Sequence, residues 1–144
     1  MENSMRTPLH LWIVGSVSAL WNAFGCFDYV MSQTRNQAYL AALTDAQRAY
    51  FDHFPAWVQA AWAFGVWGAL LGSMLLLTRS RWAVTAFAVS LAGLAVSTAW
   101  QYGVSAAPAE MRSAPMMIMN LVIWAVAIGL LLYALRMRQR GALR

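Results

Sequence analysis

Four long apolar runs, separated by shorter polar stretches, make up most of this chain. They cover about residues 9–31, 55–77, 82–103 and 115–135. Each run is long enough to cross a bilayer as a helix, which takes about 20 apolar residues, and a helix satisfies its own backbone hydrogen bonds in lipid. The pattern predicts an all-α, polytopic membrane protein whose single transmembrane domain, residues 1–144, is a four-transmembrane-helix bundle.

The longest loop, between the first two runs, carries a helical pattern of its own. Thr44 and Gln47 are spaced as a capping box, in which each side chain binds a free backbone N–H of the first turn. Arg48 and Asp52 are spaced for an i,i+4 ion pair. Apolar residues recur on another face at helical spacing: Ala46, Tyr50 and Phe54. We expect a short amphipathic helix at about residues 44–54 in the outer loop, either lying in the membrane interface or capping the bundle.

The composition agrees with a membrane location. Hydrophobic residues make up 61% of the chain and charged residues 10%, against roughly 45–50% and about 25% in an average soluble protein. A domain this small cannot bury so much apolar surface, because its surface-to-volume ratio is too high. The chain also has eight Trp residues, and Trp concentrates where acyl chains meet headgroups. The apolar surplus is therefore expected to face lipid.

The distribution of arginine predicts the orientation. The formal net charge is +5, but the arginines stand at the ends of the apolar runs rather than along one face, which argues against a nucleic-acid partner. If the helices alternate, one side of the membrane holds Arg35, Arg48 and Arg112. The other side holds the remaining seven: Arg6, Arg79, Arg81, Arg136, Arg138, Arg140 and Arg144. Since cytoplasmic loops carry the excess of positive charge, we expect both termini in the cytoplasm.

The predicted cytoplasmic tail, residues 136–144, is the most basic part of the chain, and its first three arginines are Arg136, Arg138 and Arg140. Each Arg near an anionic membrane surface contributes about 1 kcal/mol of attraction. We expect this tail to bind lipid headgroups, with contact to a protein partner as the alternative.

Small residues at helical spacing mark the faces on which the helices are expected to pack. In lipid, helices associate where small side chains let their backbones approach closely. The predicted packing residues are Gly15, Ser18 and Gly25 in the first run, Gly65, Gly68 and Gly72 in the second, and Ser90, Gly93 and Ser97 in the third. The fourth run has Ala125 and Gly129 and is otherwise bulky, so we expect it to face lipid or a partner.

Five amide or carboxyl side chains lie within the runs, all near the outer ends or the midplane: Asn22, Asp28, Gln59, Gln101 and Asn120. A charged group at the centre of a bilayer costs about 2.5–3.5 kcal/mol, so it usually has a partner or a task. Two interpretations stay open. These residues form a polar, ligand-binding pocket that opens to the outside, or each reaches headgroups and water while its hydrogen bonds fix the helix packing.

Candidate chemistry is otherwise sparse. The sequence has no nucleophile–base pair, phosphate-binding loop or metal-ligand spacing. Its single cysteine, Cys26, excludes an internal disulfide. His10 and His53 are expected on opposite sides of the membrane, so they cannot hold one metal ion together. We therefore expect no enzymatic activity, no cofactor and no bound metal.

Several segments resemble a family of short, uncharacterised four-helix bacterial inner-membrane proteins, some of which carry an automatic "sugar transporter" label. The resemblance runs through Leu11–Gly15, Leu20–Gly25, Phe27–Asn36, Phe54–Trp57 and Gly65–Gly68, all within residues 11–68. It implies the four-helix architecture and a location in the bacterial inner (plasma) membrane. It implies no catalytic or binding residues.

Two functions agree with these features. The first is a non-enzymatic accessory or assembly subunit that packs beside a larger membrane complex, or against further copies of itself, with the lipid bilayer as its other partner. The alternative is a small-solute, sugar-like transporter or binding protein that uses the outward-facing polar pocket. Transporters expose a site to both sides, often through broken helices. Because no proline interrupts a run and the inner half lacks polar lining, the first function is favoured.

Overall fold

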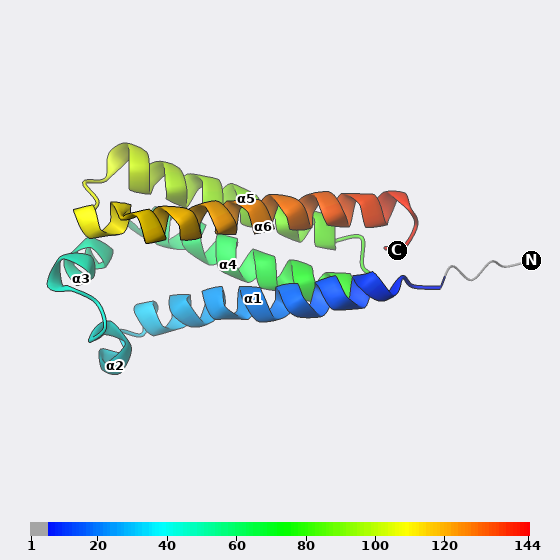
Figure 1. The fold of residues 1–144 in the computed structure, drawn as a ribbon, viewed down its shortest axis with the longest axis horizontal. Coiled ribbons are helices and arrows are strands. Elements are labelled where there is room, and N and C mark those ends of the chain that lie inside the picture. The colour runs from blue at the N-terminus through cyan, green and yellow to red at the C-terminus, as the bar shows by residue number, and fades with distance from the viewer. Residues whose placement is uncertain (1–5) are drawn as a thin grey trace, which may run out of the picture.

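The computed structural model describes residues 6–144, which are helical with no β-strand among them. Its four long helices are α1 (Leu9–Gln33), α4 (Ala56–Leu77), α5 (Ala83–Ala99) and α6 (Ala114–Gln139) (Figure 1). Two short helices, α2 (Gln37–Leu40) and α3 (Asp45–Asp52), connect α1 to α4. A π-helical segment, η1 (Trp100–Val104), continues α5, and a 3₁₀ turn, η2 (Ala109–Arg112), precedes α6.

All four long helices, with α5 counted through η1, are long and apolar enough to cross a membrane. The predicted all-α fold with four such helices is confirmed. Their ends differ slightly from the prediction, since α1 and α6 run two and four residues further toward the C-terminus. Below, the loop end of the bundle is the end with α2, α3 and η2, and the tail end is the opposite end, with the α4–α5 turn and residues 140–144 (Figure 1).

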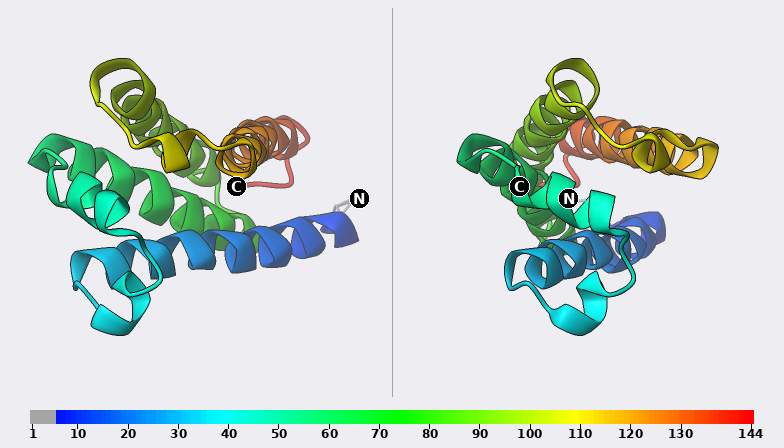
Figure 2. Two further views of the ribbon diagram at one scale, coloured as in Figure 1. Left: turned by 60° about the vertical axis from the view of Figure 1, so that its left-hand side comes forward. Right: turned by 90° about the vertical axis from the view of Figure 1, so that its left-hand side faces the viewer.

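The long helices form an open arc rather than a closed square. α1 packs on α4, α4 on α5, and α5 on α6. Seen along the bundle, α1 and α6 are the two ends of this arc (Figure 2). They lie further apart at the loop end than at the tail end. One side of the bundle is therefore open.

Glycines bring the backbones of α4 and α5 together at the centre of the arc. A Cβ atom added to Gly93 would lie 2.5 Å from the carbonyl oxygen of Ala61 and 2.7 Å from the nitrogen of Gly65. On Gly68 it would lie 3.2 Å from the carbonyl oxygen of Ala86. Because real Cβ atoms do not approach backbone so closely, larger residues here would push the two helices apart.

Hydrogen bonds and a sulfhydryl contact join α1 to α4. The Ser18 hydroxyl lies 2.8 Å from that of Ser73, and the Asn22 side-chain nitrogen donates to the same hydroxyl at 2.9 Å. Further along, the Cys26 sulfhydryl lies 3.3 Å from the carbonyl oxygen of Val66. A polar seam therefore runs along this helix pair, as is common where helices pack in lipid.

Three further predicted packing residues, all glycines, also lie at helix contacts. Cβ atoms added to Gly15 and Gly72 would lie 2.7 Å from the side chains of Leu77 and Phe87, and one on Gly25 would lie 3.4 Å from Val66. These glycines of α1 and α4 lie at contacts between helices, as Ser90 does through its bond to Gly65, whereas Ser97 bonds to Gly93 of its own helix. α6 is the least buried of the four helices.

Two apolar clusters hold the ends of the bundle. The tail-end cluster joins all four helices and includes Leu11, Leu76, Phe87, Leu130 and Ala134. The loop-end cluster consists of Tyr50, Val58 and Trp100, with Phe54, Ala107 and Met111 packed against it. α3 therefore rests on the ends of α4 and α5 through Tyr50.

The capping box at the start of α3 is present, as predicted. The Thr44 hydroxyl accepts from the backbone of Gln47 at 3.2 Å, and the Gln47 amide oxygen accepts from the backbone of Thr44 at 3.0 Å. The predicted ion pair between Arg48 and Asp52 is wrong. Arg48 turns back to Asp45, at 3.4 Å, and donates twice to the carbonyl oxygen of Leu43. Asp52 instead pairs with Arg35, at 3.1 Å.

The last residues of the chain fold back onto the α4–α5 turn. α6 continues to Gln139, and its Arg136 and Arg138, like Arg140, are exposed. After Gly141 the chain reverses, and the backbone of Arg144 exchanges hydrogen bonds of 2.8 and 2.9 Å with Arg79 and Arg81. Residues 136–144 are therefore partly helix and partly a segment packed on the bundle rather than a free tail.

Candidate functional site

A crevice of about 410 Å³ opens between α1 and α6 and reaches inward to α4 and α5. One wall is a stripe on α1 formed by Trp21, Phe24 and Asp28. The facing wall on α6 includes Met119 and Ile123. The positions on α1 follow the three-and-four spacing of one helix face. The crevice is thus built from apolar and aromatic side chains around a few polar groups.

The crevice exists because α1 and α6 meet at the tail end and then diverge. At that end the His10 ring nitrogen Nδ1 lies 2.6 Å from the Tyr133 hydroxyl, with the two rings edge to face. Leu11 packs in the same cluster as Leu130 and Ala134. Toward the loop end the two helices separate (Figure 2). The crevice therefore runs along the length of the helices, from Asp28 and Met119 to Leu130, on the open side of the arc.

Asn22 presents an acceptor to the crevice. Its side-chain nitrogen donates to the carbonyl oxygen of Ala69 at 3.1 Å and to the Ser73 hydroxyl at 2.9 Å. A carbonyl can only accept, so the amide nitrogen must point that way. The oxygen Oδ1 then has no described protein partner. This oxygen is at least partly accessible, because every fully buried side-chain N or O atom in residues 6–144 has a hydrogen-bond partner.

Asp28 stands in the half of the crevice nearer the loop end. Its carboxylate accepts a hydrogen bond from the Tyr39 hydroxyl, which α2 brings against this face of α1. Burial, followed by the hydrogen bond to Asp28 and its charge, raises the pKa of Tyr39 to about 12. The phenol therefore stays a donor at neutral pH. In the described part of the chain, both salt bridges join other residues, so Asp28 has no cationic partner.

Two serines of α5 complete the polar lining. The Ser90 hydroxyl donates to the carbonyl oxygen of Gly65 at 2.6 Å, and that of Ser97 donates to Gly93 at 2.8 Å. A hydroxyl that has given its proton away retains lone pairs. Like Asn22 and Asp28, both serines can therefore only accept a further hydrogen bond. Apart from its two indoles, the polar side chains of the crevice are all acceptors.

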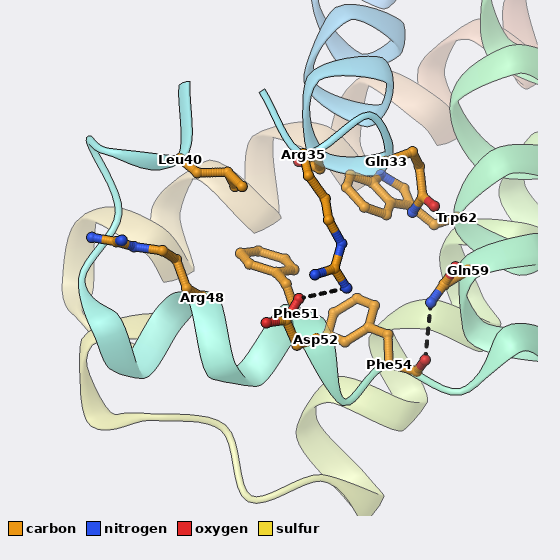
Figure 3. A pocket seen from close by; sticks show the side chains of 10 residues that line it. Gln33, Arg35, Leu40, Arg48, Phe51, Asp52, Phe54, Gln59 and Trp62 are labelled. Carbon is orange, nitrogen blue, oxygen red and sulfur yellow. Dashed lines mark hydrogen bonds and ion pairs between the residues drawn. The ribbon is translucent and has the colours of Figure 1, made fainter. Parts of the chain in front are cut away.

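A second, smaller pocket of about 180 Å³ lies at the loop end between α1, α3 and α4 (Figure 3). The guanidinium of Arg35 crosses it to Asp52, and the Gln59 amide donates to the carbonyl oxygen of Phe54 at 3.0 Å. Its best-placed polar groups are thus paired within the chain. Trp62 lines both this pocket and the crevice. The crevice, which has an unpaired acceptor and an uncompensated carboxylate, is the stronger candidate site.

The structure places the five predicted pocket residues in different parts of the molecule. Asn22 and Asp28 line the crevice, and Gln59 lines the loop-end pocket. Gln101 lies in η1 and Asn120 near the start of α6, and neither lines these two cavities. Asn120 lies on a different face of α6 from its neighbour Met119, which does line the crevice. Gln101 lies beyond the end of α5, in η1, and the crevice residues of α5 stop at Ser97.

Sequence reasoning missed several members of the site. Tyr39 was not connected to Asp28. The Trp residues, Trp21 and Trp62 among them, were expected as a class at the membrane interface, and Phe24 was given no role. One signal was available, because Trp21, Phe24 and Asp28 share a helix face that also carries the only acid of the long helices. The α6 wall gave no such signal.

Within residues 6–144, no three His, Cys, Asp or Glu side chains are grouped as a metal site would require. No protein-family model, curated protein or solved structure matches this chain.

Proposed function

We propose that the protein is a non-enzymatic membrane protein that binds a small, largely apolar molecule in the crevice between α1 and α6. The observation that carries this proposal is a crevice of about 410 Å³ lined by all four long helices, with a few polar groups in apolar walls. Ligand sites generally have this composition, in which apolar walls supply affinity and a few polar groups fix the orientation. Binding for transport and binding for storage or sensing both begin at such a site.

This proposal departs from the sugar-like solute suggested by sequence. A sugar carries hydroxyl groups on all sides, and each one buried against an apolar wall without a partner costs free energy. The walls formed by Phe24, Ile123 and Val126 offer no such partners. A molecule that is mainly apolar, with one or two polar groups, matches the crevice better.

We place the four long helices across a bacterial inner membrane, with the tail end in the cytoplasm. Support comes from the exposed Arg136, Arg138 and Arg140 at that end, since positive charge favours the cytoplasmic side and anionic headgroups. The loop end with α3 then lies outside, where Tyr50 docks α3 on the bundle. In this setting the crevice opens into the lipid.

A substitution that fills the crevice tests the proposal. Ala127 lines it, whereas Ala125, two residues earlier on α6, is exposed and does not. We expect Ala127→Trp to abolish retention of a bound apolar molecule by protein purified in mild detergent, as measured by native mass spectrometry. Ala125→Trp is the matched control and should retain it. Equal retention by both variants, or none by the wild type, contradicts the proposal.

An accessory subunit of a larger membrane complex is the second candidate, supported by the exposed outer face of α6. Ile118 is 61% exposed and Leu121 69%, on the least buried long helix. If a partner helix covers this face, replacing Leu121 by Asn will release a partner that co-purifies at fixed stoichiometry. Ala127→Trp, within the crevice, will leave that complex intact. A complex that survives the Leu121 substitution excludes this face.

A further inference from the structure

The geometry points to a lipophilic organic cation as the occupant of the crevice: an apolar body carrying a protonated amine that binds at Asp28. This inference rests on the proposed small-molecule site and names the class of its ligand. Three independent features support it: an uncompensated carboxylate, a polar lining that consists of acceptors apart from two indole N–H groups, and aromatic walls.

The carboxylate of Asp28 is the only acidic group in the four long helices. It has one described hydrogen bond, from Tyr39, and no ion pair among residues 6–144. The arginines of α6 lie at its tail end, whereas Asp28 lies toward the loop end. A half-buried carboxylate without a cation is costly in a low-dielectric setting. A cationic ligand supplies the missing partner.

The hydrogen-bonding capacity of the crevice also favours a donor. Asn22 offers Oδ1, while the hydroxyl protons of Ser90 and Ser97 are already given to backbone carbonyls. A protonated amine brings donors and no acceptor, so it complements these groups without leaving one unpaired. An anionic ligand would face Asp28, and neither Arg nor His lines the crevice.

The aromatic wall suits both the charge and the apolar body. Trp21, Phe24 and Trp62 line the same crevice as Asp28, and the faces of aromatic rings attract cations. Along α1, Asn22 is six residues from Asp28, roughly 9 Å of helix rise. An amine at Asp28 therefore leaves the apolar body between the walls, where a second donor on the molecule would reach Asn22.

Three probes with the same apolar cage and different heads test this inference: adamantylamine, adamantanol and adamantane carboxylate. Binding is measured by isothermal titration calorimetry on the whole protein in a neutral detergent near pH 7. We expect wild-type protein to bind the amine about tenfold more tightly than the alcohol, the size expected for one charge-assisted contact, and to exclude the carboxylate. Asp28→Asn should remove this preference, so that the amine no longer binds more tightly than the alcohol.

Two variants separate a ligand contact from a structural effect. Tyr39→Phe removes the hydrogen bond to Asp28 and keeps the carboxylate, whereas Asp28→Asn removes the charge and keeps an oxygen that can accept from Tyr39. Tyr39→Phe should therefore retain the preference for the amine. Asp52→Asn removes an acid outside the crevice and should also retain it. Loss of the preference in Tyr39→Phe would show that Asp28 acts by holding α2.

The remaining outcomes distinguish this inference from the proposed function. Equal binding of amine and alcohol by the wild type, abolished in both cases by Ala127→Trp, would overturn the cation inference and leave the apolar site standing. If none of the probes binds, the cation inference is overturned. The proposed apolar site is then tested separately, by the retention experiment with Ala127→Trp. Tighter binding of the carboxylate than of the amine would reverse the assigned ligand charge.

Discussion

Ser73 connects the hydrogen bonds that join α1 to α4. It is fully buried, it lies within hydrogen-bond distance of Ser18 and Asn22, and it donates to the carbonyl oxygen of Ala69 at 3.1 Å. Removing its hydroxyl leaves one N–H of Asn22 without an acceptor, whereas Ser18 retains a bond to Gly15. A buried donor that loses its partner destabilises the folded state more than a surface change does.

We therefore expect Ser73→Ala to lower the free energy of unfolding by about 1 kcal/mol, in line with the modest value of hydrogen bonds between membrane helices. Unfolding in increasing concentrations of a denaturing detergent, followed by circular dichroism, measures this change in free energy. Ser16→Ala is the matched control, because Ser16 is exposed on α1. Equal stability of the two variants would show that these bonds do not contribute.

Tyr39 carries a pH-dependent part of the stability. Its pKa is raised to about 12 by burial and by Asp28, whereas an unfolded tyrosine titrates near pH 10. The folded state holds this proton more tightly, so the contribution is complete below pH 10 and falls as the pH rises toward 12. We expect the melting temperature of the wild type to exceed that of Tyr39→Phe by a constant amount near neutrality, and the difference to shrink between pH 10 and 12. A constant difference across that window would contradict this assignment.

At the scale of elements, the contact between α4 and α5 is the least tolerant of added volume. We expect Gly93→Ala to destabilise the protein by about 1–3 kcal/mol, because its methyl group meets backbone that cannot rotate away. Gly129→Ala on α6 is the matched control, since nothing lies within 4 Å of a Cβ atom there. Thermal unfolding in detergent compares them. A Gly93 variant as stable as the Gly129 variant would mean that α4 and α5 are further apart than described.

Three helices end in the same way, with a residue in the left-handed region. Arg35 after α1 has φ 51°, Arg79 after α4 has φ 60°, and Gly141 after α6 has φ 71°. In each case the next residue donates its N–H back to a carbonyl of the last turn, as in the Schellman motif. The two arginines pay the conformational cost of this position and recover contacts, Arg35 with Asp52 and Arg79 with the backbone of Ala142.

The elements were largely predictable and their arrangement was not. Run length and polarity were enough to predict four membrane-length helices. The spacing of Thr44 and Gln47 indicated the start of α3. The spacing of small residues also marked packing faces on the first three runs, which are α1, α4 and α5. The left-handed conformation of Arg35 and Arg79 at the helix ends could not be predicted, because arginine has no preference for that conformation. The divergence of α1 from α6 was hidden too, since it depends on side-chain volumes across four helices rather than on any one pattern.

The candidate site shows the same division. Asn22 and Asp28 stood out because polar groups are rare in apolar helices. Their separation from Gln101 and Asn120 could not be foreseen, because depth along a helix says nothing about which helices are neighbours. Tyr39 was hidden by its place in a short connecting helix, where an aromatic residue has many ordinary roles.

At the scale of the whole molecule, the proposed orientation makes a direct prediction. A green fluorescent protein fused after Arg144 will fluoresce, because it folds in the cytoplasm, whereas alkaline phosphatase fused there will be inactive. Alkaline phosphatase inserted between Ala41 and Ala42, in the loop-end connection, will be active. The reverse pattern at both positions would show that the orientation in the membrane is opposite to the one proposed. Replacing Arg79 and Arg81 by Gln should weaken the preference for this orientation, since both arginines contribute to the charge difference between the two ends of the bundle.

For the proposed ligand and the proposed membrane orientation, the opening between α1 and α6 determines how the molecule must arrive. In a bilayer this opening meets acyl chains before it meets water, so a molecule has to dissolve in the membrane and then diffuse in two dimensions to the protein. Its concentration among the lipids, rather than in the buffer, then governs occupancy. Apparent affinities expressed per litre of solution will shift whenever the amount of lipid or detergent is changed, and compounds will rank partly by their partition coefficients. Affinities should be compared as mole fractions in the membrane phase.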